Sequence, residues 1–146
     1  MSLPSPPDPD YAARARASFA SQGALRYLGA RLTLVPPGRC VVELPFRPEL
    51  TQQDGFFHAG VATTIVDTAC GYAAFTLMPA GARVLTVEFK MNLVAPARGE
   101  LLRATGRVER AGRTLTVVRG EVEALTGGQA VTVALMQETM MRLAER

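Results

Sequence analysis

Asp67 is the one charged residue in the segment "AGVATTIVDTACGYAAF", which runs from Ala59 to Phe75. The other residues of this segment are apolar, small or threonine, so we expect the segment to be buried. Burying an ionised carboxylate without a partner costs several kcal/mol, so a lone one needs a reason. A carboxylate can act as a general base or as a nucleophile, and Asp67 is therefore the first candidate for chemistry.

The composition indicates one folded domain with a substantial core. The chain has 146 residues, of which 48% are hydrophobic and 20% are charged. A net charge of +3 argues only weakly for an anionic partner, and aromatic residues do not interleave with the basic ones, so a nucleic-acid surface is not expected. One histidine and the separated Cys40 and Cys70 offer no metal-ligand spacing. Buried reduced thiols and a cytoplasmic location are expected.

The N-terminus "MSLPSPPDPD" is rich in proline and lacks both the basic start and the apolar run of a signal peptide. We expect residues 1–8 to be a disordered leader and residues 9–146 to form a single domain. The stretch 56–75 is about long enough to span a membrane. Its aspartate, its threonines and the strand patterns on both sides argue against such a span.

Turn residues and hydrophobic periodicity divide the domain into two helices and six strands. A helix follows Asp8-Pro9 and ends near Gly23, two strands form a hairpin about the turn Pro36–Gly38, and a long apolar helix runs from His58 to about Met78. In the stretch 85–93, apolar residues at odd positions alternate with Thr86, Glu88, Lys90 and Asn92, which predicts a strand with one apolar face. Three more strands follow, with breaks at 111–112 and 127–128.

Strands so close in sequence must be largely antiparallel. A twisted antiparallel sheet that curls around the long apolar helix is the simplest way to bury that helix. The predicted fold class is therefore α+β, with a sheet of about six strands, two and then four along the chain, wrapped around one central helix.

This layout, with "QQDGFFHAG" leading into "TTIVDTACGYAA", resembles the PaaI-like acyl-CoA thioesterases of the hotdog fold, over roughly residues 40–143. Their pattern is an Asn or Gln, a Gly, His-Gly-Gly at the start of the central helix, and an acidic residue nine positions after the His. Gln52, Gly55, His58 and Asp67 fall on these positions, and Ala59 replaces the first glycine of the triplet. The role of that position is a backbone N–H, which alanine preserves.

The resemblance implies roles for five catalytic residues. Asp67 would be the general base or the nucleophile, Gln52 would position the water or the carbonyl, and the Ala59 N–H would stabilise the oxyanion. His58 would hold the loop or donate to the thioester, and Thr86 would lie near the nucleophilic water. The alternatives are a structural carboxylate for Asp67, an exposed loop amide for Gln52 and a helix cap or surface residue for His58.

The resemblance also implies a substrate-binding set of Gly60, Arg110, Gly112, Arg113 and Thr114. The last four belong to a turn that looks like the hairpin with which the family contacts phosphopantetheine or the nucleotide. Two arginines around a turn glycine suit phosphate contact through side chains and backbone. Most of the other arginines are expected on solvated strand faces.

The helix geometry predicts a dimer. Ala59 and Asp67 are eight residues apart, about 12 Å along a helix axis, so they are too far apart to act on one carbonyl from the same helix. An antiparallel helix from a second copy would bring Asp67 beside the other chain's helix terminus. A two-fold homodimer with composite sites follows, and we also expect a homotetramer built as a dimer of dimers.

The predicted function is hydrolysis of an acyl- or aryl-acyl-CoA without a metal or redox cofactor. The alternatives are a non-catalytic acyl-CoA-binding hotdog module, a hotdog dehydratase, and a structural protein with an apolar dimer surface. Asp67 argues against the binding module and the structural protein, which have no use for a lone buried carboxylate. A dehydratase pairs a histidine with a carboxylate, and only His58 could fill that role.

Overall fold

The structure is a computed structural model that describes residues 3–144. Its helices and strands are, in chain order, α1 (Tyr11–Ser21), α2 (Gly23–Leu28), β1 (Arg31–Leu34), β2 (Arg39–Pro45), η1 (Pro48–Leu50), α3 (Ala59–Phe75), β3 (Arg83–Leu93), β4 (Leu101–Ala111), β5 (Leu115–Thr126) and β6 (Gln129–Leu143). A disordered leader over residues 1–8 stays a prediction, and residues 1–2 lie outside the described part.

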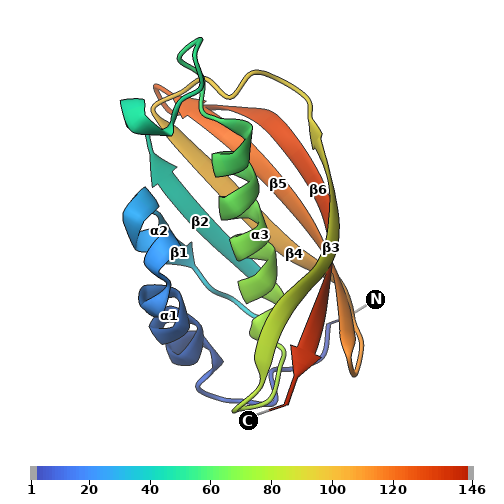
Figure 1. The fold of residues 1–146 in the computed structure, drawn as a ribbon. Coiled ribbons are helices and arrows are strands. Elements are labelled where there is room, and N and C mark those ends of the chain that lie inside the picture. The colour runs from blue at the N-terminus through green and yellow to red at the C-terminus, as the bar shows by residue number, and fades with distance from the viewer. Residues whose placement is uncertain (1–2, 145–146) are drawn as a thin grey trace.

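The six strands form one antiparallel sheet in the order β1-β2-β4-β5-β6-β3. The sheet curls around α3, and α1 and α2 lie beside the helix toward the β1 side (Figure 1). The predicted α+β class, the six strands and the central helix are confirmed. The short helix α2 was not predicted. No helix of the described residues is long and apolar enough to cross a membrane.

Helix α3 is buried over most of its length because its residues are small and apolar on nearly every side. It begins where the His58 side chain accepts a hydrogen bond from the Gly60 N–H, an N-terminal cap. It ends at Phe75, a turn earlier than the predicted Met78, and Thr76 is its C-cap.

Two glycines of the sheet allow α3 to lie directly on the strands. A Cβ atom at Gly106 of β4 would come within 2.5 Å of the Ala69 backbone, and one at Gly120 of β5 would come within 2.5 Å of Val66 Cγ2. Any larger residue would push the helix away from the sheet. These glycines therefore fix the position of the middle of α3, where Asp67 lies.

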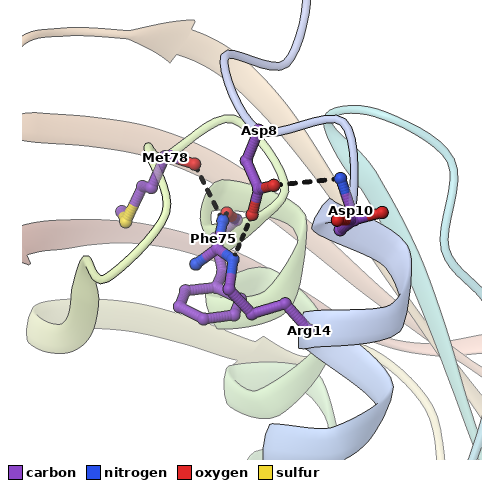
Figure 2. Close-up of polar contacts among 5 residues, drawn as sticks. All are labelled: Asp8, Asp10, Arg14, Phe75 and Met78. Carbon is purple, nitrogen blue, oxygen red and sulfur yellow. Dashed lines mark hydrogen bonds and ion pairs between the residues drawn. The ribbon is translucent and has the colours of Figure 1, made fainter.

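Arg14 of α1 ties the N-terminal segment to the C-terminal end of α3 (Figure 2). Its guanidinium donates to Asp8 Oδ2 at 2.6 Å and to the carbonyls of Phe75 and Met78 at 3.3 and 2.8 Å. It also lies 4.0 Å from the centroid of the Phe75 ring. A cation here donates to carbonyls that have no hydrogen-bond donor within the helix, because they lie at its end.

A β-bulge changes the predicted alternation in β3. Thr86 pairs with Met140 and Glu88 pairs with Thr139, so Val87 is an extra residue in the strand. Paired residues of antiparallel strands point to the same face, so Thr86 shares the helix-facing side with Phe89. The prediction that the odd positions of 85–93 share one face is therefore wrong at Leu85, which pairs with Met141.

The contact at Gly106 generates a stability prediction. Gly106→Ala should lower the free energy of unfolding by about 2 kcal/mol or more, because its methyl would overlap backbone atoms that cannot rotate away. Gly71→Ala is the control: its methyl would meet only the flexible end of Met140, at 3.4 Å, and alanine favours helix. Urea unfolding of the two variants measures the difference, and equal stabilities would contradict the close contact.

Candidate active site

Asp67 lies half-buried in the middle of α3 and faces β3. The Thr86 hydroxyl donates a hydrogen bond to Asp67 Oδ1 at 2.6 Å. This short, charge-assisted bond fixes one carboxylate oxygen and leaves the other available. Because of the bulge at Val87, Thr86 points toward the helix, so two residues that the sequence singled out separately are in direct contact.

A pocket of about 310 Å³ opens beside Asp67 between α1, α3 and the start of β3. Its apolar lining includes Phe75, Val84 and Met140. At one side the Tyr72 hydroxyl lies 3.0 Å from Ser18 Oγ and accepts a hydrogen bond from Gln22 Nε2 at 2.8 Å. The pocket therefore has a mixed lining, in which apolar side chains alternate with polar ones, and the Tyr72 hydroxyl is a polar group that no sequence pattern had indicated.

A second pocket of about 460 Å³ lies at the N-terminal end of α3 and includes Gln52 and Ala59 in its lining. No hydrogen bond to the Ala59 N–H is seen among the described residues. His58 is exposed, and its Nδ1 accepts from the Gly60 N–H at 2.9 Å. In this arrangement His58 is a helix cap, the Gly60 N–H is occupied, and the Ala59 N–H is the open donor.

Gln52 lies in the loop before α3 and is held by local contacts. Its side-chain Oε1 accepts from the Asp54 N–H, and its backbone bonds to Phe56 and Gly55. Asp54 itself is exposed in the turn. The Gln52 Nε2 also donates to Asp54 Oδ2 at 3.4 Å. Gln52 thus lines the second pocket, and its side-chain amide is bonded within its own loop.

The two groups of candidate residues do not meet within one chain. Ala59 and Asp67 lie on the same straight helix, about 12 Å apart along its axis, and no residue lines both pockets. A single carbonyl cannot touch both within one chain.

The hairpin between β4 and β5 holds Arg110, Gly112, Arg113 and Thr114, all exposed. Its Gly112 N–H bonds to the Leu115 carbonyl at 2.9 Å, and the Thr114 carbonyl accepts from the Arg142 N–H at 2.8 Å. The hairpin lies at the end of the sheet where β3 begins (Figure 1). It is thus on the Asp67 side of the molecule and remote from the helix N-terminus.

The structure adds a residue that sequence reasoning missed. Glu138 of β6 is fully buried, and neither of its carboxyl oxygens has a hydrogen-bond partner among the described residues. Burial, and then the neighbouring Asp67, raise the pKa of Glu138 to about 9. A signal was present: Glu138 stands between Met136 and Met140 on the apolar phase of its strand. Asp67 is therefore not a lone carboxylate.

The cysteines are buried free thiols, as predicted. Burial raises the pKa of Cys40 to about 12, and burial together with Glu138 raises the pKa of Cys70. Both thiols therefore stay protonated and unreactive at neutral pH. No group of three or more potential metal-ligating His, Cys, Asp or Glu side chains occurs in the described part of the chain.

Comparison with known proteins shows the family of this chain. A sequence profile described as the thioesterase superfamily matches residues 54–131, more than half of the chain. The chain belongs to the thioesterase superfamily. It is a hydrolase of that superfamily. One relative is a protein of Saccharolobus solfataricus, whose name proposes that it is an esterase. The two sequences are 32% identical over 102 residues, which cover 70% of this chain and 72% of the relative.

Solved structures of other thioesterase superfamily members share the fold. A thioesterase family protein from Silicibacter pomeroyi superposes with a TM-score of 0.90 at 46% identity, covering 92% of this chain and 98% of that chain. The E. coli PaaI protein superposes with a TM-score of 0.82 at 21% identity, covering 93% and 95% of the two chains. The hotdog fold expected from the sequence is confirmed.

The bond between Thr86 and Asp67 gives the second prediction. Thr86→Val should lower kcat/KM for thioester hydrolysis about tenfold or more, because a hydrogen bond to a charged group contributes roughly 1.5–3 kcal/mol. Thr86→Ser keeps the hydroxyl and should retain most of the activity. Steady-state kinetics of the two variants make the comparison. Activity retained by Thr86→Val but lost by Thr86→Ser would assign the effect to packing of the threonine methyl, which valine keeps.

Proposed function

We propose that this thioesterase superfamily member hydrolyses acyl- or aryl-acyl-CoA to the free acid and CoA. The observation that carries the proposal is the Asp67 carboxylate, held by Thr86 and facing a pocket with apolar and polar walls. Hydrolysis of a thioester needs a carboxylate to activate water or to attack, and donors for the developing oxyanion. A pocket lined by Tyr72 and Phe75 suits an acyl group with an aryl ring.

In the proposed reaction, Asp67 either removes a proton from a water that attacks the carbonyl carbon or attacks that carbon itself. The C–S bond then breaks, and CoA leaves as the thiol after taking up a proton. On the first route the acid forms at once; on the second, water hydrolyses the anhydride between the acyl group and Asp67, which releases the acid and restores the carboxylate. The carbonyl oxygen would accept a hydrogen bond from the Ala59 N–H at the positive end of a helix dipole. Gln52 would hold the carbonyl or the water.

The separation along α3 implies that Asp67 of one chain works with Ala59 of another. Support comes from β3, which is an edge strand with one row of unpaired backbone groups. Its side chains Leu85, Val87, Phe89 and Leu93 are 45% to 59% exposed, unusual for such large apolar residues. Antiparallel pairing of two β3 strands would cover this surface and place two α3 helices side by side. The homotetramer and the cytoplasmic location stay predictions.

The exposed β4–β5 hairpin would bind the phosphates of CoA. Arg110 and Arg113 are exposed, at the end of the sheet where β3 begins. Guanidinium groups pair with phosphate in a bidentate way, which suits the CoA nucleotide. The alternative of a non-catalytic acyl-CoA-binding module uses the same pocket and hairpin but not the carboxylate.

Asp67→Asn tests the proposal directly. The amide is isosteric but neither a base nor a useful nucleophile, so CoA release should fall about 10²–10⁴-fold on the best substrate. The assay follows CoA release from a panel of alkyl- and aryl-acyl-CoAs, after circular dichroism and sedimentation show the variant to be folded like wild type. Equal turnover by the two proteins would remove Asp67 from the mechanism, and binding without turnover by wild type would favour the binding module.

The composite site has its own test. Ala59→Pro removes the N–H of the first helical residue, a position that tolerates proline, and the preceding His58 already has the extended ψ of 138° that proline requires. Ala59→Pro and Asp67→Asn should each be nearly inactive alone. Mixed dimers isolated with two affinity tags contain one intact site of two and should regain about half of wild-type activity.

Complementation is possible only if each site takes its two groups from different chains. Mixed dimers as inactive as either parent would therefore place both groups in one chain and overturn the composite site. Dimers that carry both substitutions in the same chain are the matched control, because one of their chains is wild type and none of their composite sites is intact in both groups.

A further inference from the structure

The inner face of β6 carries a carboxylic acid directly beneath α3. Glu138 has no exposed surface, and both of its carboxyl oxygens are without a hydrogen-bond partner in the described part of the chain. A buried acid without partners is costly and uncommon, so its retention calls for a physical reason.

Few polar groups face Glu138. The side chains that affect its ionisation are Asp67 and Cys70 from α3 and Thr86 from β3. On either side within the sheet, its register partners are Phe89 of β3 and Val118 of β5, which do not ionise. Among the described residues, Asp67 is thus the one charged group that acts on Glu138. Two neighbouring carboxyl groups share a proton rather than both ionising.

The proton belongs to Glu138 because it is the more deeply buried of the two. Burial and the charge of Asp67 raise the pKa of Glu138 to about 9, whereas Asp67 is half-buried beside the open pocket. A protonated carboxyl group has one O–H to donate. The Thr86 hydroxyl already donates to Asp67 Oδ1, and a thiol is a weak acceptor, so the carboxylate of Asp67 is the strongest acceptor available.

We propose that Glu138 is a positioning residue: in its neutral form it donates a hydrogen bond to the Asp67 carboxylate and, together with Thr86, fixes the orientation of that carboxylate toward the substrate. The proposal rests on the proposed role of Asp67 in hydrolysis. Thr86 holds the carboxylate from β3, and Glu138 holds it from β6 below the helix.

The kinetic test compares Glu138→Gln with Glu138→Met. Glutamine keeps a donor that cannot ionise, so kcat should stay within about threefold of wild type, while the alkaline decline of wild-type activity near pH 9 should disappear. Methionine fills the space without a donor, so kcat should fall about tenfold or more with little change in KM. Glu49→Gln, at an exposed carboxylate, is the control and should match wild type at every pH.

A thermal test needs no substrate. Folded Glu138 holds its proton up to about pH 9, whereas the unfolded chain releases it near pH 4.5, so the contribution of this group to stability declines as the pH rises between these values. Glu138→Gln removes the decline. Its melting temperature should therefore exceed that of wild type by a margin that grows from about pH 5 to about pH 9, and Glu49→Gln should show no such trend.

The outcomes are distinguishable. If wild type releases CoA from no substrate, the proposed function fails, and a flat thermal difference would independently show that Glu138 is not a neutral buried acid. If wild type is active but Glu138→Met keeps its kcat and its pH profile, the positioning role is overturned while the thioesterase proposal stands. Retention of the alkaline decline in Glu138→Gln would likewise overturn it.

Discussion

The contact between α3 and the glycines of β4 and β5 determines where every candidate group lies. Because Gly106 brings the sheet against the Ala69 backbone and Gly120 brings it against Val66, the helix cannot slide or rotate without a clash. Asp67 lies between these two contact points in sequence. Its distance from β3 and β6 is therefore set by backbone packing, which is far stiffer than a surface loop.

The neighbours of the Asp67 carboxylate offset the free-energy cost of burying it in this rigidly packed helix. Thr86 donates to Asp67 from β3, and the bulge at Val87 turns the hydroxyl inward while leaving the following apolar residues on the same face. Glu138 avoids a second buried charge by staying protonated. The charge of Asp67 thus lies in a site with donors and an open pocket, and α3 can remain an otherwise apolar core helix.

The sequence predicts the parts of the structure that depend on local pattern. The long apolar segment became α3, the alternating stretches became strands, and the turn glycines fell between β4, β5 and β6. Two features could not be predicted, because they depend on how the strands pair. The bulge at Val87 exists only relative to β6, so alternation within β3 could not show it, and Glu138 looked like one more charge in a strand until the register placed it beneath Asp67. The catalytic roles and the CoA-binding hairpin stay predictions.

The spacing along α3 also explains why the free edge of β3 matters. A helix fixes the rise per residue, so no side-chain rotation brings the Ala59 N–H and the Asp67 carboxylate to one carbonyl. Their separate pockets open at different ends of the same helix. A second helix running the opposite way removes this limit, since it presents its N-terminus beside the first helix's midpoint. The apolar side chains and free edge of β3 are the surface through which such a partner could be held in register.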